Sequence, residues 1–153
     1  MKRIAVYPGT FDPITKGHEA LVKRALPLFD EIIVAIGVNS KKQSYFPIEK
    51  RIAWLKKVFS PYPQVHVDVF EGLTIEYCQK KHANFILRGL RSSTDFEYER
   101  NIAQANNSLA PDIETVFLVS AAGLSAINSS IVRDIHRHGG DTTLFIPDGI
   151  VLD

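Results

Sequence analysis

The sequence predicts an α/β domain in which a doubly wound, five-stranded parallel sheet carries helices on both of its faces. The first reason is that short runs of branched apolar residues alternate five times with amphipathic stretches. Neighbouring parallel strands need such crossovers, which are usually helices. The second is size, because 153 residues with 45% hydrophobic content suffice for one packed core and are too few for two. We therefore expect a single domain over residues 1–153.

Five segments have the composition of strands. The clearest is EIIVAIGV, because nearly continuous apolar sequence is typical of a strand buried on both faces. The short run RIAVY comes first along the chain, and a Pro-Gly pair follows it. The expected strands are Arg3–Tyr7, Glu31–Val38, Val65–Phe70, Asn84–Leu87 and Glu114–Val119.

Five amphipathic segments carry helix signals. Pro47 suits the first turn of the second helix, where a backbone N–H would have no partner. Thr94 and Glu97 match a capping box at the start of the fourth, and Gly139 with Gly140 ends the fifth. The expected helices are Lys16–Leu28, 48–59, Thr74–Lys81, Thr94–Asn107 and Ser129–His138.

The charge balance and the cysteine content narrow the function classes. Eighteen basic and seventeen acidic side chains leave a net charge of +1, which gives no global field to attract nucleic acid or an anionic membrane. No apolar stretch has the length that a bilayer requires. Cys78 is the single cysteine, so neither an internal disulfide nor a cysteine metal site is indicated. We expect a cytoplasmic protein without nucleic-acid or membrane partners.

The loops after the strands have the composition of an anion site. In doubly wound sheets, ligands bind beyond the carboxyl ends of the strands. The segments that follow strands one, two, four and five are rich in glycine, cationic side chains or hydroxyls. They read GTFDPITKGH, NSKKQ, RGLRSSTD and SAAGLSAINSS.

The segment GTFDPITKGH holds the first candidate residues. It lacks the Gly-Lys-Ser/Thr ending of a Walker A loop, and its glycines are wrongly spaced for the dinucleotide fingerprint. Gly17 precedes His18 at a helix start, where free N–H groups and the helix dipole favour a phosphate. His18 is thus a candidate phosphate ligand, although a lone histidine at a helix start is more often a surface or capping residue.

Arg88 and Arg91 flank a glycine at the end of the fourth strand. Arginines in this place suit bidentate contacts with phosphate. The alternative is that they form ion pairs with Asp95, Glu97 or Glu99 in the helix that follows. Both interpretations remain open from the sequence.

Weaker candidates lie in two further loops. Lys41 and Lys42 follow the second strand, a position that favours a role in binding, whereas adjacent lysines in loops are usually only solvated. Asn128, Ser129 and Ser130 stand at the start of the last helix. One of them is expected as an ordinary N-cap, and the spare hydroxyls could hold a phosphate.

The motifs together resemble a known family. YPGTFDPITKGH is similar to the (T/H)xGH signature of the nucleotidyltransferase superfamily, with Thr10 and the pair Gly17-His18 in its positions. RGLRSSTDFEYE and INSS narrow the resemblance to the Rossmann-like bacterial phosphopantetheine adenylyltransferases, from the first strand to about Pro147. The resemblance implies transfer of AMP from ATP to 4′-phosphopantetheine, which gives dephospho-CoA and pyrophosphate in coenzyme A synthesis. It also implies a homohexamer, and Mg²⁺ that is held mainly by the ATP phosphates.

The resemblance also assigns roles to residues. Those implied in catalysis are Thr10, His18, Lys42 and Arg91. Those implied in ATP binding are Thr10, Phe11, Gly17, His18, Gly89, Leu90, Arg91, Glu99, Leu124, Ser125, Ala126, Ile127, Asn128, Ser129 and Ser130. Those implied in binding the acceptor are Thr10, Lys42, Thr74 and Arg88, with Lys41 as the alternative to Lys42. No protein metal ligand is implied.

The implied reaction suits these residue types. The attacking phosphate oxygen is already ionised at neutral pH, so the site needs cations and N–H donors rather than a general base. Two other functions stay open: an adenylyl or cytidylyl transferase with a different phosphate acceptor, and a nucleotide-binding regulator without turnover. Leu124 and Asn128, which depart from the family pattern, give the second its weight.

Overall fold

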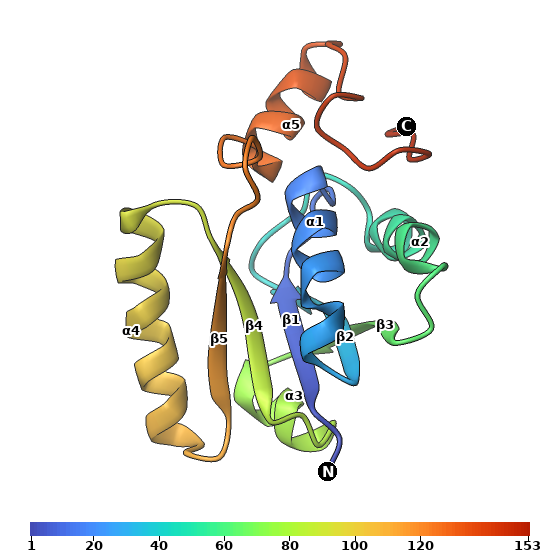
Figure 1. The fold of residues 1–153 in the computed structure, drawn as a ribbon. Helices are drawn as coiled ribbons and strands as arrows, with labels where there is room; N and C mark the ends of the chain where they lie inside the picture. Colours follow the sequence, from blue (N-terminus) through green and yellow to red (C-terminus); the bar gives the residue numbers. More distant parts are fainter.

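The computed structural model describes residues 1–153 and confirms the predicted fold class. Its five strands form one parallel sheet in the order β3-β2-β1-β4-β5 (Figure 1). The strands are β1 Ile4–Gly9, β2 Glu31–Val38, β3 Val65–Glu71, β4 Phe85–Leu90 and β5 Glu114–Val119. The helices are α1 Lys16–Ala25, α2 Ile48–Phe59, α3 Thr74–Lys80, α4 Ser93–Leu109 and α5 Ser129–Arg137, with a 3-10 turn, η1, at Leu26–Leu28.

The strand order switches sides between β1 and β4: β2 and β3 are added on one side of β1, and β4 and β5 on the other. A doubly wound sheet opens a crevice at such a switch point. The β1–β4 ladder has only two registered pairs, Ala5 with Phe85 and Val6 with Ile86, whereas β4 and β5 remain paired up to Leu90 and Val119. The carboxyl-terminal halves of β1 and β4 are therefore not joined by a ladder. The main cleft of the structure lies at this gap.

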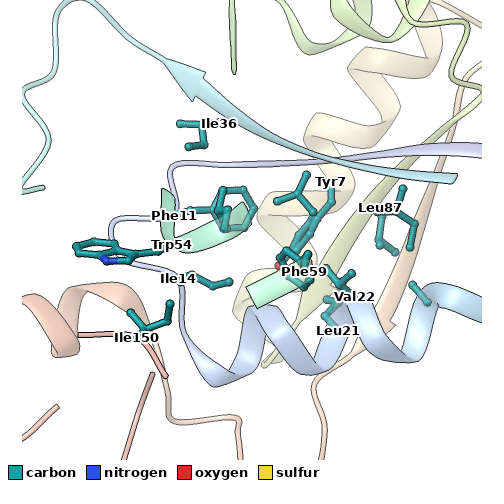
Figure 2. Close-up of a cluster of buried hydrophobic side chains, with 14 of the residues drawn as sticks. Tyr7, Phe11, Ile14, Leu21, Val22, Ile36, Trp54, Phe59, Leu87 and Ile150 are labelled. Atoms are coloured by element: carbon teal, nitrogen blue, oxygen red, sulfur yellow. The ribbon is translucent and has the colours of Figure 1, made fainter. Parts of the chain in front are cut away.

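Two apolar clusters pack on opposite faces of the sheet, because successive side chains of a strand point to opposite sides. Tyr7 of β1 belongs to the larger cluster, which includes Val22 of α1 and Trp54 of α2. Figure 2 shows Tyr7, Trp54 and Ile150 in this cluster. Val6 belongs to the second cluster, with residues of α3 and the fully buried Cys78. The predicted helices on both faces are thus present.

Several boundaries differ from the prediction. β1 continues through Gly9, and β4 continues through Leu90, because ladder partners in β2 and β5 extend these strands beyond their apolar cores. The first helix ends at Ala25 and gives way to η1, where Pro27 has no N–H to continue the α-helical pattern.

The predicted cap of the fourth helix is wrong. α4 begins after Ser92, whose hydroxyl accepts a hydrogen bond from the backbone N–H of Asp95 at 3.2 Å. Thr94 lies inside the first turn of α4 and does not cap it. The hydroxyls of RSST offer several caps, and Ser92 is the one with extended backbone geometry.

None of the helices combines the length and apolar composition that a membrane-spanning segment needs. Figure 1 shows α5 and the segment after it beyond the carboxyl ends of the strands, above β1 and α1. Lys16 at the start of α1 donates its backbone N–H to the carbonyl of Phe145 at 2.9 Å. The carboxyl-terminal segment thus closes over the edge of the sheet at which ligands are expected.

Candidate active site

A cleft of about 370 Å³ opens at the carboxyl ends of β1, β4 and β5, beside the starts of α1 and α5. It brings together most of the predicted site residues from four separate segments. Those that line it are Thr10, Phe11, Gly17, His18, Arg88, Gly89, Leu90, Arg91, Glu99, Leu124, Ile127, Asn128, Ser129 and Ser130. Two predicted residues of the same loop, Ser125 and Ala126, are exposed and do not line it.

His18 is held by the capping structure of α1. Its backbone N–H donates to the hydroxyl of Thr15 at 3.4 Å, and its Nδ1 accepts the backbone N–H of Thr15 at 3.0 Å. The ring also packs edge-on against Phe11, with 4.9 Å between centroids. Because Nδ1 is an acceptor, the proton of the neutral ring is on Nε2. His18 therefore belongs to the capping box of α1, whose N-cap is Thr15, and it also lines the cleft, so the two roles are compatible.

His18 is a neutral donor at physiological pH. Burial, followed by the charges of Arg88 and Arg91, lowers the pKa of His18 to about 4. The Thr15 N–H reinforces this effect, since it needs an unprotonated Nδ1. An Nε2–H group held in one orientation can stabilise negative charge that develops on a phosphate without changing its own charge.

Arg88 and Glu99 form an ion pair on the wall of the cleft. Arg88 Nη2 lies 2.6 Å from Glu99 Oε1, and Arg88 Nε lies 3.1 Å from Oε2. Arg88 Nη1 donates to the carbonyl of Pro8 at 2.6 Å, across the gap where β1 and β4 are no longer paired. Burial by itself lowers the pKa of Arg88, but the hydrogen bonds and charge of Glu99 more than offset it and raise the pKa.

Arg91 lies where β4 passes into α4, and it links this turn to the loop before α5. Its Nη1 donates to the carbonyl of Ile127 at 3.3 Å, and its Nε lies 3.4 Å from Asp95 Oδ2. The predicted ion pairs and the predicted cleft position are therefore both present for Arg88 and Arg91. Glu97, the third suggested partner, pairs with neither arginine.

The start of α5 uses its polar residues in different ways. Asn128 is the N-cap, and its Oδ1 accepts the backbone N–H of Ile131 at 2.9 Å. Ser129 donates its hydroxyl to the carbonyl of Pro13 at 2.8 Å and so attaches α5 to the TFDP loop. Ser130 accepts a hydrogen bond from Arg133 at 3.1 Å. Asn128 thus fills the ordinary role, while both serines remain on the cleft wall.

A second cleft of about 360 Å³ adjoins the first. Thr74, predicted to bind the acceptor, lines this cleft, as do Asn39 and Asn106. The residues that line both clefts come from the β1 end, β4 and α4. They are Pro8, Gly9, Thr10, Arg88 and Glu99.

The structure does not bring Lys42 or Lys41 into either cleft. Both side chains are exposed in a turn that Asn39 stabilises: its Oδ1 accepts the N–H of Lys41, and its carbonyl accepts the N–H of Lys42, each at 3.0 Å. Asn39 is the residue of this loop that lines the second cleft.

Sequence reasoning missed two further arginines of the main cleft. Arg24 of α1 donates to the carbonyl of Val119 at 2.6 Å, and Arg133 of α5 donates to the carbonyl of Asp12 at 2.8 Å. A signal for Arg133 was present, because it follows Ser130 by three residues and so lies on the same side of the helix. Arg24 lies inside helix α1 and not in a loop after a strand, where ligands of doubly wound sheets are expected to bind.

The carboxylates of the main cleft do not form a metal site. Asp12 accepts two backbone N–H groups, Asp95 pairs with Arg91, and Glu99 pairs with Arg88. No group of three or more His, Cys, Asp or Glu residues is placed to hold a metal ion. The residues present therefore do not fit a protein-held Mg²⁺.

The comparisons with known proteins agree with this geometry. A family model described as cytidylyltransferase-like matches residues 6–135. The phosphopantetheine adenylyltransferase of Flavobacterium johnsoniae is 52% identical over 148 residues, which is 97% of each chain. The chain belongs to the phosphopantetheine adenylyltransferase family.

Other relatives in this family are similarly close. The phosphopantetheine adenylyltransferase of Cytophaga hutchinsonii is 50% identical over 96% of this chain and 98% of its own length. That of Leptospira biflexa is 49% identical over 97% of this chain and 92% of its own. Phosphopantetheine adenylyltransferases are nucleotidyltransferases, so the sequence resemblance is confirmed.

A solved structure supports the fold of this family member. The bifunctional NMN adenylyltransferase/ADP ribose pyrophosphatase from Francisella tularensis aligns with a TM-score of 0.69. The alignment covers 95% of this chain and 45% of that protein. At 18% identity, this likeness extends to the Rossmann-like architecture alone.

Proposed function

We propose that this chain transfers the adenylyl group of ATP to 4′-phosphopantetheine and releases pyrophosphate, with dephospho-CoA as the product. The observation that carries the proposal is the pair of adjoining clefts that share Thr10 and Arg88. Two anionic substrates need neighbouring sites with cations and hydrogen-bond donors at their junction. Membership of the phosphopantetheine adenylyltransferase family supports this choice of substrates.

ATP is assigned to the main cleft. Its wall includes the start of α1 at Gly17 and the start of α5 at Ser129 and Ser130. Helix starts offer free N–H groups and a favourable dipole to phosphates. Four arginines against three carboxylates line this cleft, and we assign the triphosphate to the region they surround.

The acceptor is assigned to the second cleft. Arg88 lies between the two clefts and is the cation placed to hold the acceptor phosphate beside the α-phosphate of ATP. Thr10 lines both clefts and can donate its hydroxyl to either substrate. The apolar wall, with Phe70 and Ile102, suits the pantetheine arm.

The transfer needs no proton acceptor in the protein. An ionised oxygen of the acceptor phosphate attacks the α-phosphorus of ATP, an O–P bond forms, and the bond to the leaving pyrophosphate breaks. His18 donates Nε2–H to the α-phosphate oxygen on which charge accumulates. Arg91 stabilises the same charge as a fixed cation at the β4–α4 turn.

Lys42 is assigned to the transferred phosphate because its loop adjoins the acceptor cleft. The segment 39–44 joins the end of β2 to Tyr45, and Asn39 of this segment lines the acceptor cleft. A lysine on this segment becomes a ligand of the transferred phosphate when the substrates draw the loop over the cleft. Lys41 is the alternative because it shares the turn.

We assign Mg²⁺ to the substrate rather than to the protein. The committed carboxylates of the main cleft leave the ATP phosphates and water as its ligands, a coordination that Mg²⁺ favours.

Assembly into a homohexamer belongs to the same proposal. It is supported by large apolar side chains that α4 leaves exposed on one side, namely Tyr98, Ile102 and Leu109. Contiguous apolar surface on a helix is typical of protein interfaces. A cytoplasmic location remains a prediction.

The deciding experiment is a coupled pyrophosphate-release assay with ATP, Mg²⁺ and 4′-phosphopantetheine. Parallel reactions replace ATP with CTP, or the acceptor with pantetheine, which lacks the phosphate. We expect release only with ATP and the phosphorylated acceptor. Release with CTP would favour a cytidylyl transferase, and ATP binding without release would favour a regulator.

A further inference from the structure

Two oppositely charged side chains are almost completely buried at the loop Thr10–Pro13, which follows β1. Asp12 is 4% exposed and Arg51, in the first half of α2, is 6% exposed. Buried charges are found where they have hydrogen-bond partners, and both residues have several. Their partners belong to the loop Thr10–Pro13 and to Tyr45–Phe46, which follow the segment 39–44 that contains Lys41 and Lys42, the lysine loop.

Arg51 joins these two segments through their backbones. Its Nη1 donates to the carbonyl of Thr10 at 2.9 Å, and its Nε donates to the carbonyl of Phe46 at 3.1 Å. Arg51 lines neither cleft. Arg51 can therefore affect the reaction only by fixing the positions of Thr10 and Phe46.

Asp12 makes the complementary contacts. Its Oδ2 accepts the N–H of Tyr45 at 2.7 Å, and its Oδ1 accepts the N–H of Phe46 at 2.8 Å. The carbonyl of Asp12 accepts a hydrogen bond from Arg133 of α5 at 2.8 Å. Asp12 lines the main cleft, but its two carboxylate oxygens are committed to the backbone.

These contacts fix one end of the segment 39–44. Its first end leaves β2, and its other end is attached at Tyr45 and Phe46 to the loop that contains Thr10. Lys41 and Lys42 lie between the two attachments. The Asp12 carboxylate therefore fixes the end of the lysine loop relative to the loop Thr10–Pro13, and this limits where Lys41 and Lys42 can lie relative to the clefts.

We propose that Asp12 and Arg51 are positioning residues for adenylyl transfer, which hold Thr10 and the end of the lysine loop in one fixed arrangement. The inference rests on the proposed function, and Arg51 acts without contact to either substrate. We call the hydrogen bonds of Asp12 and Arg51 to Thr10, Tyr45 and Phe46 the brace. Loss of the brace displaces the groups that contact the transferred phosphate, and small displacements of such groups lower kcat strongly. A purely structural role would lower stability and leave the turnover of the folded protein unchanged.

The first test compares Arg51→Met with Arg51→Lys in the full chain. We expect Arg51→Met to lower kcat at least tenfold while the KM for ATP changes less than threefold, because its side chain meets neither cleft. Arg51→Lys should recover part of kcat, since one ammonium group can reach only one carbonyl at a time. If folded Arg51→Met and Arg51→Lys both keep kcat within twofold of the parent, the inference is wrong.

Ile113→Ala is the matched control for stability. Ile113 is buried in the cluster on the opposite face of the sheet and contacts neither cleft. It should lower the melting temperature without lowering kcat of the folded protein. An equal loss of kcat in Ile113→Ala at equal loss of stability would reduce Arg51 to a structural residue.

A second readout is independent of turnover. Hydrogen exchange of the Tyr45 and Phe46 amides, followed by NMR in the parent and in Arg51→Lys, reports on the brace directly. We expect faster exchange of both amides in the variant, with exchange in β2 unchanged. Unchanged protection overturns the inference, whether or not the parent transfers adenylyl groups. Failure of the parent to release pyrophosphate would instead count against the proposed function alone.

Discussion

Arg88 and Glu99 form the wall between the two clefts, with Nη2 of the arginine 2.6 Å from Oε1 of the glutamate. Glu99 and the carbonyl of Pro8 fix the planar guanidinium, and one N–H on each of Nη1 and Nη2 is left to meet a phosphate. From the sequence, the ion pair with Glu99 was an alternative to phosphate binding by Arg88. In the structure this ion pair instead holds Arg88 in an orientation that suits phosphate binding. The ion pair and the binding role are compatible because arginine has several donors.

Arg88→Ala should raise the KM for phosphopantetheine at least tenfold and affect the KM for ATP much less. The variant also leaves the carboxylate of Glu99, 9% exposed, without its partner. We expect a loss of about 2 kcal/mol in stability, below the range for fully buried pairs because the Arg88 side chain is 31% exposed. Steady-state kinetics and urea unfolding measure the two effects.

The double variant Arg88→Ala/Glu99→Gln separates them. A neutral amide is less costly to leave unpaired, so stability should return most of the way to that of the parent. The KM for phosphopantetheine should stay high. Recovery of both properties together would mean that Arg88 has no direct contact with the acceptor.

His18→Ala should lower kcat about a hundredfold, which corresponds to about 3 kcal/mol of lost transition-state stabilisation. ATP affinity, measured by calorimetry, should change less than threefold, because the Nε2–H bond strengthens only as charge develops. His18→Gln is the matched variant, since its amide N–H can reach the position of Nε2. Parent-level kcat in His18→Ala would remove His18 from the mechanism.

The stability of the protein should depend on pH through His18. The pKa of His18 is about 4 in the folded protein and about 6.5 in an unfolded chain, so the unfolded state binds more protons between these values. The free energy of unfolding should therefore fall as pH drops from about 6.5 toward 4, by no more than about 3 kcal/mol. Urea titrations over this range test it, and the slope should be smaller in His18→Gln. Equal slopes in parent and variant would contradict the lowered pKa.

Asn128→Ala should cost about 1 kcal/mol of stability, because the start of α5 loses its N-cap. Asn128→Ser keeps a capping oxygen and should retain the stability of the parent. The KM for ATP distinguishes the two roles considered for this residue. A higher KM in the serine variant would show that the amide itself contacts the nucleotide.

The sequence predicted the sheet, its helices and most of the cleft because apolar periodicity and loop composition are local signals. It did not predict the extent of β4, because pairing of Leu90 with Val119 in β5 sets that boundary. Arg24 was missed for a related reason, since a helical arginine reaches the cleft only through the packing of α1 on the sheet. The contacts of Arg51 could not be predicted either, because its partners are backbone carbonyls, and one of them, that of Thr10, lies 41 residues away in the chain.

Gly89 shows how tightly that packing is set. A Cβ atom at this position would lie 2.6 Å from Cδ1 of Leu21, so Gly89→Ala must displace the Leu21 side chain or α1. Such overpacking costs about 1–3 kcal/mol in a core. Leu21 follows His18 by three residues on the same helix and lines the same cleft, so we also expect kcat to fall several-fold.

The double variant Gly89→Ala/Leu21→Val completes this prediction. The shorter valine makes room for the added methyl group, so the stability and kcat lost in Gly89→Ala should partly return, a coupling that a double-mutant cycle measures. Thermal unfolding and pyrophosphate release give the two quantities. If the four proteins show additive effects, the contact between Gly89 and Leu21 does not control the position of His18.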